Sequence, residues 1–387
     1  MTPRGRGLLL GGLLLIVVGL AVGARELAAA GLAGVVAVVL AAVVTARTPS
    51  LTVDRQVEPG RVERGGAAFA LVTIANSGRL PAVRLSGSDA AGTERLAIAI
   101  PRLAAGASHR ATVRLPTDRR GPVPVGPLTL ARVDPFSLVR RAAVVGGSTE
   151  LLVHPRVVPL HEGRTSLARV LDGPEADTAL EGTLAFHTLR EYVLGDDQRH
   201  IHWRSSARTG TLMVKQHVDT ARPIVAVLLD TRPAQESEPF EVAVDVVASL
   251  GAAALLRGAP LAVLTAGGDL DGAATLGGGA GTAAGADAAL LLDALARVQP
   301  EPAAPVALAG AVRRLASRGP GSLAVLVTPR PVGEVVADLR PLTGRFATVL
   351  AVGCSGGSSA GTRVGAVATL TLTDVADLPG LLRLVAP

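Results

Sequence analysis

The sequence has few residues of the types that usually mark a disulfide, a metal centre or an aromatic core. Its 387 residues include one Cys, one Trp, one Tyr and five Phe. A single Cys, Cys354, excludes an intramolecular disulfide and a cysteine-based zinc site, and we interpret it as a small buried residue. Because aromatic residues make up 2% of the chain, the cores have to be built from aliphatic side chains. The length leaves room for two or three such cores.

Lysine is nearly absent too. Lys215 is the only one, so the basic residues behind the net charge of +6 are almost all Arg, and they are scattered along the chain. No basic run is long enough to indicate a tail that binds nucleic acid. We therefore expect no nucleic-acid partner, and we interpret the charge as general surface together with proximity to a membrane.

The N-terminal region has two long uncharged runs. Residues 8–24 and 27–46 are apolar and are separated only by one Arg and one Glu. A bilayer core is crossed by about 20 apolar helical residues, with about 17 as the lower limit, so both runs can span it. The alternatives are a cleaved signal peptide and a buried helical hairpin of a soluble domain. A cleaved chain would still begin with a membrane helix, and no polar residues mark a solvent face, so we expect a two-pass anchor in residues 1–50.

The charges that flank these runs predict the orientation of the anchor. Arg4 and Arg6 precede the first run, and Arg47 and Arg55 follow the second. The turn between the runs has no excess of positive charge. The positive-inside rule therefore predicts a protein of the cell membrane with both ends, and its soluble domains, in the cytoplasm.

Residues 51–155 contain short runs of alternating apolar and polar residues between turn residues. This pattern predicts an antiparallel, immunoglobulin-like β-sandwich, in which no catalytic constellation appears. The tripeptide Asp134-Pro135-Phe136 is predicted to be a turn with Phe136 plugging the edge of the sandwich. The strand-like runs are residues 67–78, 95–100, 109–115, 126–133 and 149–155.

Residues 223–387 alternate between strand-like and helix-like segments. This alternation predicts a parallel sheet with helices on both faces, in a doubly wound, Rossmann-type α/β domain. Ligands of such domains bind beyond the carboxyl ends of the strands, so the loop 230–234 is the expected place for a site. The run GGGAG at 277–281 lacks the Lys-Ser/Thr ending of a phosphate loop, and we interpret it as a surface loop. The predicted strands are 223–230, 260–266, 322–328 and 345–353, and the predicted helices are 240–258, 286–298, 306–318, 332–342 and 376–384.

One stretch, residues 189–217, concentrates the rare residue types. It holds the only Trp, Tyr and Lys, the only Met after the initiator and three of the seven His. Its acidic and basic side chains nearly balance, which predicts a partly buried network of Arg–carboxylate pairs. Residues 195–197, Gly-Asp-Asp, predict a turn into a short helix with an Asp as its cap, and we expect Ile201 and Trp203 to point towards the core. Residues 210–218 predict a strand that leads into the α/β domain.

Two chemical interpretations of this stretch compete with a structural one. His200 and His202 have the spacing found at some metal sites, but no third ligand has a diagnostic spacing and the neighbouring Arg residues would repel a cation. A hydrolytic interpretation pairs His202 and Asp196 with a nearby serine. The candidates are Ser205 and Ser206, and no nucleophile-elbow pattern surrounds them. A metal-dependent or hydrolytic enzyme that uses residues 189–217 stays open as the alternative function.

The same stretch carries a family resemblance. It shows Arg-Glu-Tyr at 190–192, Gly-Asp-Asp at 195–197, Ile-x-Trp at 201–203 and Ala-Arg-x-Gly at 207–210. In this order the residues resemble the signature of the domain of unknown function 58 family. Further matches extend the resemblance over nearly the whole chain, namely Arg-Gly at 120–121, Gly-Pro-Leu at 126–128 and Asp-Pro-Phe at 134–136.

The resemblance implies a membrane-anchored protein whose C-terminal domain is similar to von Willebrand factor type A. Such proteins are often associated with MoxR-type AAA ATPases and transglutaminase-like proteins. A type A domain binds a divalent cation through Asp-x-Ser-x-Ser after its first strand, with a Thr and an Asp from later loops. Here Asp230 remains, but Arg232 and Ala234 replace both Ser, and residues 328–330, Thr-Pro-Arg, supply no carboxylate. We therefore expect a degenerate site without a metal, and no other cofactor.

Together these observations predict an α+β multidomain chain. We expect a membrane hairpin in residues 1–50, a sandwich in 51–155, a connector in 156–222 and the α/β domain in 223–387. We expect a non-enzymatic scaffold or interaction module that works with a MoxR-type ATPase, and we assign no catalytic residue. The candidate docking residues are Arg190, Glu191, Tyr192, Gly195, Asp196, Asp197, Arg199, His202, Trp203, Arg204, Arg208 and Gly210.

Overall fold

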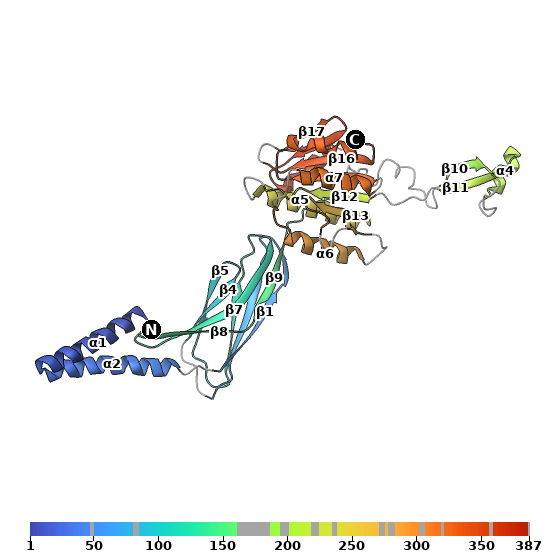
Figure 1. The fold of residues 1–387 in the computed structure, drawn as a ribbon. Coiled ribbons are helices and arrows are strands. Elements are labelled where there is room, and N and C mark those ends of the chain that lie inside the picture. The colour runs from blue at the N-terminus through green and yellow to red at the C-terminus, as the bar shows by residue number, and fades with distance from the viewer. Residues whose placement is uncertain are drawn as a thin grey trace. The chain divides into compact units, whose positions relative to one another are not determined.

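The computed structural model describes residues 1–46, 50–79, 85–160, 186–193, 201–217, 224–233, 238–270, 275–277, 283–301, 306–318, 321–355 and 359–385. The chain divides into two compact units, Met1–His154 and Pro155–Pro387 (Figure 1).

Unit 1 begins with the two apolar helices that the sequence predicts, α1 (Pro3–Val22) and α2 (Arg25–Ala46). Both are long and apolar enough to cross a membrane, with mean hydropathies of 2.2 and 2.7. They pack closely, because a Cβ added to Gly19 would lie 2.6 Å from the Ala28 backbone nitrogen. Small residues at such contacts are typical of paired membrane helices. A third apolar helix, α5 (Glu238–Leu256), is 78% buried over its apolar window and is therefore a core helix of unit 2.

The rest of unit 1 consists of two sheets that share one aliphatic core. The three-stranded sheet has the order β1-β3-β6, and the larger sheet has the order β2-β9-β7-β4-β5, with β8 paired to β7. Side chains such as Ile74 and Leu128 fill the space between the sheets. The prediction of a purely antiparallel domain is wrong at one edge, because β2 and β9 are parallel. The strands are β1 (Leu51–Glu58), β2 (Arg61–Glu63), β3 (Phe69–Asn76), β4 (Leu85–Ala91), β5 (Glu94–Ile100), β6 (Ser108–Arg114), β7 (Gly121–Val133), β8 (Arg140–Val145) and β9 (Thr149–His154).

Arg55 has a different place from the one that the charge pattern predicts. Its guanidinium donates to both carboxylate oxygens of Asp89 on β4, at 2.6 and 3.2 Å, and to the carbonyl of Gly147. The Arg55 and Asp89 side chains are only 4% and 2% exposed. Arg55 therefore joins the two sheets and does not act as a free charge beside the membrane, so the predicted orientation depends on the other flanking Arg residues.

The tripeptide at 134–136 forms a turn, as predicted, but Phe136 does not plug the sandwich. The Asp134 carboxylate accepts the N–H groups of Phe136 and Val139, at 2.9 and 2.6 Å. Phe136 is 76% exposed. Leu138 is the buried apolar residue of the turn, and it packs against α2, not between the sheets. The expectation for Phe136 is wrong because the apolar helices supply a second surface for the turn.

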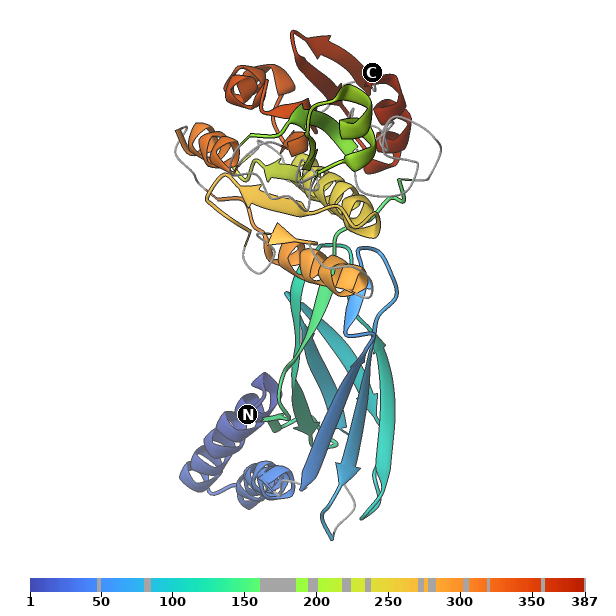
Figure 2. The same ribbon diagram turned by 90° about the vertical axis from the view of Figure 1, so that its right-hand side faces the viewer.

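Unit 2 contains a seven-stranded sheet with the order β14-β13-β12-β15-β16-β18-β17. The five inner strands β13, β12, β15, β16 and β18 are parallel. The edge strands β14 and β17 are antiparallel to their neighbours. Aliphatic clusters cover both faces, with α5 and α6 on one and α7 on the other (Figure 2). The elements are β12 (Ile224–Leu229), α5, β13 (Leu261–Thr265), β14 (Thr275–Leu276), α6 (Ala283–Arg297), α7 (Val306–Ser317), β15 (Gly321–Thr328), β16 (Phe346–Gly353), β17 (Ala360–Val364), β18 (Val367–Thr371) and α8 (Leu378–Val385).

The doubly wound arrangement confirms the predicted parallel sheet, with two local differences. The predicted helix at 332–342 forms the 3₁₀ turns η3 (Val332–Glu334) and η4 (Val336–Leu342). Pro341 lies within η4 and has no N–H group to extend an α-helix. The edge strands β14 and β17 were not predicted, because short edge strands have little apolar patterning. The interior strand β18 was also not predicted, and it is only five residues long.

Cys354 is buried, at 2% exposure. Burial raises the pKa of its thiol, and the negative charge of Asp245 raises it further. The folded thiol therefore stays protonated, whereas an unfolded thiol titrates near pH 8.5.

We expect Cys354 to resist alkylation in the native protein at pH 7.5 and to react fully in denaturant. Burial of the protonated thiol contributes to the free energy of unfolding, and this contribution is complete below about pH 8.5. Above that pH the free energy of unfolding falls by about 1.4 kcal/mol per pH unit until the folded pKa is reached. Denaturant titrations of the wild type and Cys354→Ala at several pH values measure this. The same pH dependence in both proteins would contradict the expectation.

Candidate functional site

The candidate site lies at the carboxyl edge of the sheet in unit 2. β12 and β15 are neighbours at the centre of the sheet, and the chain runs from β12 to β13 on one side and from β15 to β16 on the other. The loops that follow β12 and β15 therefore run in opposite directions along the sheet. They form the switch point where doubly wound domains usually bind ligands. Asp230 to Arg232 follow β12, and Thr328 ends β15. The predicted loop 230–234 is thus at the switch point, although Ala234 is outside the described residues.

A buried ion pair fills this switch point. Asp230 is fully buried, and Arg232 donates from Nε and a terminal nitrogen to its two carboxylate oxygens, both at 2.8 Å. Thr328 donates its hydroxyl to the same carboxylate at 2.8 Å, and the Arg232 N–H adds a contact at 3.2 Å. The hydrogen bond that Arg232 donates to Asp230 raises the pKa of Arg232, against the effect of burial. Asp230 therefore has an internal cation as its partner.

The rim of the site has charges of both signs. Arg330 donates to Glu334 at 3.0 Å, and the two side chains are 39% and 49% exposed. Glu301 is also exposed, and its N–H donates to the carbonyl of Thr231 at 2.8 Å. The Thr231 hydroxyl is buried and has no hydrogen-bond partner among the described residues. The edge thus has a polar, charged rim around a closed centre.

These residues do not fit a divalent cation. Such an ion needs several free oxygen ligands in near-octahedral geometry. Both oxygens of Asp230 already accept hydrogen bonds, and the Arg232 guanidinium lies against them. Within the described part of the chain no group of three or more His, Cys, Asp or Glu side chains could hold a metal ion.

The rare-residue stretch forms a small module of its own. β10 (Phe186–Glu191) and β11 (Met213–His217) pair antiparallel, and α4 (Trp203–Thr209) lies between them in sequence. The N–H of Tyr192 donates to the carbonyl of Leu212 at 2.8 Å. Gly210 is the C-cap of α4 and has a φ of 75°. This left-handed conformation explains the glycine of Ala-Arg-x-Gly. β11 is the strand that the sequence predicts.

His202 caps α4. The predicted turn at 195–197, with an Asp as a helix cap, is outside the described residues. The Nδ1 of His202 accepts the N–H of Ser205 at 3.3 Å and lies 2.7 Å from the Ser205 hydroxyl. The Ser206 side chain is buried and hydrogen-bonds to the backbone. Its hydroxyl donates to the His202 carbonyl at 3.1 Å and accepts the Met213 N–H at 2.8 Å, so it ties α4 to β11. Of the two serines, Ser205 therefore remains the candidate nucleophile.

The structure tests only part of the predicted docking set. Ile201 is buried as expected, but Trp203 is 67% exposed, so the expectation that it points to the core is wrong. Trp203 is the first residue of a short helix and lies on its outer side with Arg204 and Arg208, which are also exposed, as is Glu191. The residues outside the described ranges are Gly195, Asp196, Asp197, Arg199 and His200, and for Arg190 only the backbone is described.

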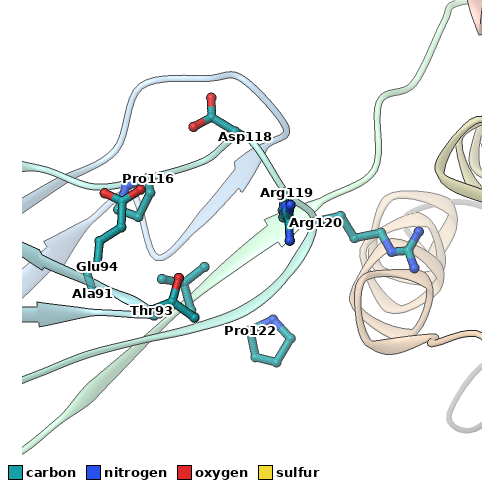
Figure 3. Close-up of a pocket in the computed structure, with 10 residues that line it drawn as sticks. Ala91, Thr93, Glu94, Pro116, Asp118, Arg119, Arg120 and Pro122 are labelled. Carbon is teal, nitrogen blue, oxygen red and sulfur yellow. The ribbon is translucent and has the colours of Figure 1, made fainter. Parts of the chain in front are cut away.

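Unit 1 has a separate hollow of about 430 Å³ beside the turns β4–β5 and β6–β7 (Figure 3). Glu94 and Asp118 contribute carboxylates to its lining and Arg119 contributes a positive charge. It is open to solvent and combines both signs of charge, so we assign it no ligand.

Comparisons with known proteins support the family resemblance. Residues 188–326 match the model of the family described as protein of unknown function DUF58. This match covers most of the small module and the loop after β12, and it ends before Thr328. A search of the curated proteins found no match.

Among solved structures, the chain is similar to the CARDB domain of a Pyrococcus furiosus protein in complex with di-metal ions. The identity is 15% and the TM-score 0.21, over 27% of this chain and 93% of that one. A Bordetella pertussis protein assigned as ApaA gives 15% identity and a TM-score of 0.22, over 27% and 94% of the two chains. At these scores the similarities carry no argument about function.

Proposed function

We propose that the chain is a membrane-anchored, non-enzymatic interaction module whose α/β domain presents the carboxyl edge of its sheet to a protein partner. The observation that carries the proposal is the Arg232–Asp230 pair at the switch point. The place where related folds hold a ligand is occupied by a side chain of the chain itself. What remains accessible is the rim of charged side chains, which suits recognition of another protein.

The family resemblance makes a MoxR-type AAA ATPase the expected partner, and a transglutaminase-like protein a further associate. It also makes the α/β domain a relative of von Willebrand factor type A. Two observations support that relation, namely the strand order and the contact between Asp230 and Thr328, the two residues of the type A pattern that this chain retains. In this proposal Arg232 takes the place of the cation.

Reversal of one rim charge tests the proposal. We expect Arg330→Glu to slow association of the full-length protein with its ATPase partner roughly tenfold at low salt, because complementary charges steer encounter. Arg318→Glu is the matched control, since Arg318 has a similar surface pair with Asp269 but follows α7 at the opposite edge of the sheet. Surface plasmon resonance at several salt concentrations measures the rates. Equal effects of the two variants would contradict the proposal.

The contact between Ser205 and His202 supports a second candidate, a hydrolase with Ser205 as its nucleophile. A fluorophosphonate probe distinguishes the candidates, since it labels a serine that an adjacent base activates. The interaction proposal predicts no labelling of the native protein beyond the level of Ser205→Ala. Labelling of Ser205 in the wild type would favour the hydrolase.

A further inference from the structure

The loop between β7 and β8, residues 134–139, lies against the beginning of the first apolar helix. The Thr2 hydroxyl donates to the carbonyls of Ser137 and Leu138, at 2.6 and 2.9 Å. The Thr2 N–H donates to the Leu138 carbonyl at 3.0 Å. The backbone of Gly5 packs on the same carbonyl, where no side chain would fit. The loop is therefore fixed to the end of α1.

The loop also reaches along the helices. Leu138 is in one apolar cluster with Ala41 of α2 and Leu9 of α1. At 1.5 Å per residue, Leu9 lies about 9 Å from the start of α1, and Ala41 lies about 8 Å from the end of α2. The uncharged run of α1 begins at Leu8. When the helices span a bilayer, the tip of the loop is therefore at the boundary between headgroups and hydrocarbon.

The loop has the chemistry that this depth requires. Asp134 is 4% exposed, and its carboxylate accepts two backbone N–H groups of the loop. The Ser137 N–H donates to the Asp134 carbonyl at 2.9 Å. The polar backbone groups thus have partners within the loop, as a position beside lipid demands. The aromatic side chain of Phe136, in contrast, is 76% exposed and points away from the protein.

Exposed basic residues surround the loop. Arg4 and Arg6 lie in the first turns of α1, and Arg140 and Arg141 begin β8 directly after the loop. All four side chains are exposed. Arg guanidinium groups bind phosphate by paired hydrogen bonds, and basic groups at a membrane surface attract anionic lipids.

We infer that residues 134–139 form a second, interfacial contact with the membrane. Phe136 inserts at the headgroup boundary, and Arg140 and Arg141 bind the phosphates of anionic lipids. This contact holds the two-sheet domain against the bilayer that the helices cross. It depends on the helices being membrane-spanning, and it is independent of the proposed protein interaction.

The single Trp of the chain allows a direct test. Phe136→Trp in a Trp203→Phe background places the only Trp in the loop, and the full-length protein is reconstituted in phosphatidylcholine–phosphatidylglycerol vesicles. Lipids brominated near the headgroup quench a Trp that touches them. We expect most of the Phe136→Trp emission to be lost in these vesicles. Emission that brominated lipid leaves unchanged would overturn the inference.

Phe69→Trp in the same background is the matched control. Phe69 is at the end of β3 opposite Glu58, about 23 Å along the strand pair from Leu51, where β1 begins after the helices. We expect brominated lipid to leave its emission unchanged, and equal quenching of both variants would overturn the inference.

The arginines are tested by adding Arg140→Gln and Arg141→Gln to the Phe136→Trp protein. Removal of phosphatidylglycerol is expected to weaken quenching only when the two Arg residues are present, and the same lipid dependence without them would contradict their role.

Discussion

Arg232→Met is expected to destabilise the α/β domain by about 3–5 kcal/mol, because it leaves the carboxylate of Asp230 buried without its counter-charge. Asp230 is fully buried, and the Arg232 side chain is 14% exposed, so water replaces little of the lost contact. The carboxylate loses the two guanidinium donors and keeps only the Thr328 hydroxyl and the backbone N–H of residue 232 from this set. The domain should therefore open about a hundred- to several thousand-fold more often.

Cys354 provides the readout for this domain. As the only thiol of the chain, and a buried one, it is alkylated only when the α/β domain opens. The labelling rate in increasing urea gives the free energy of opening for each variant. Asp230→Asn combined with Arg232→Met is expected to recover most of the loss, since no buried charge remains. Arg318→Met, which breaks an exposed pair, should cost less than about 1 kcal/mol. If Arg232→Met lowers the free energy of opening by as little as Arg318→Met does, the Arg232–Asp230 pair has no structural role.

The second large effect is expected in unit 1, where Arg55→Met leaves Asp89 buried and unpaired. The two side chains are 4% and 2% exposed, and Arg55 also holds the carbonyl of Gly147. We expect the two-sheet domain to lose about 3–5 kcal/mol, while the α/β domain keeps its stability. Hydrogen exchange of peptides from β3 and β7 measures the loss, with Cys354 labelling as the reference for the other domain.

The matched control for Arg55 is Arg110→Met, which removes an exposed Arg from β6 of the same sheet. Its effect should stay within about 0.5 kcal/mol. The double variant Arg55→Met with Asp89→Asn should be more stable than Arg55→Met alone. Similar exchange in Arg55→Met and Arg110→Met would contradict the proposed link between the sheets.

The sequence predicts the broad architecture well where apolar patterns are long. The runs of α1 and α2 and the buried strands β12, β13, β15 and β16 are clear because nearly every residue in them is apolar. The pattern is weaker for β1 and β4, where more and less exposed residues alternate, and for β8, which is exposed over nearly its whole length. Edge strands such as β17, which is exposed along its length, have almost no apolar signal.

The candidate site shows why residue types alone are insufficient. The sequence reveals that Arg232 replaces a Ser of the type A pattern, but not that its side chain folds back on Asp230. That geometry depends on Thr328, which is 98 residues away from Asp230 and adjacent only through the pairing of β12 and β15. Phe136 is a similar case, because its exposure follows from the contact of Leu138 with helices more than ninety residues earlier in the chain.

Site-specific photo-crosslinking in native membranes tests the central claim most directly, that the carboxyl edge of the sheet docks a protein partner. A photoreactive residue replaces Arg330 at this edge in one variant. In a second variant it replaces Leu256, which is 76% exposed and ends α5 at the amino edge. We predict an adduct with the MoxR-type ATPase from position 330 and none from position 256. Adducts of equal yield from both positions, or none from position 330 while the ATPase is present, would contradict the account.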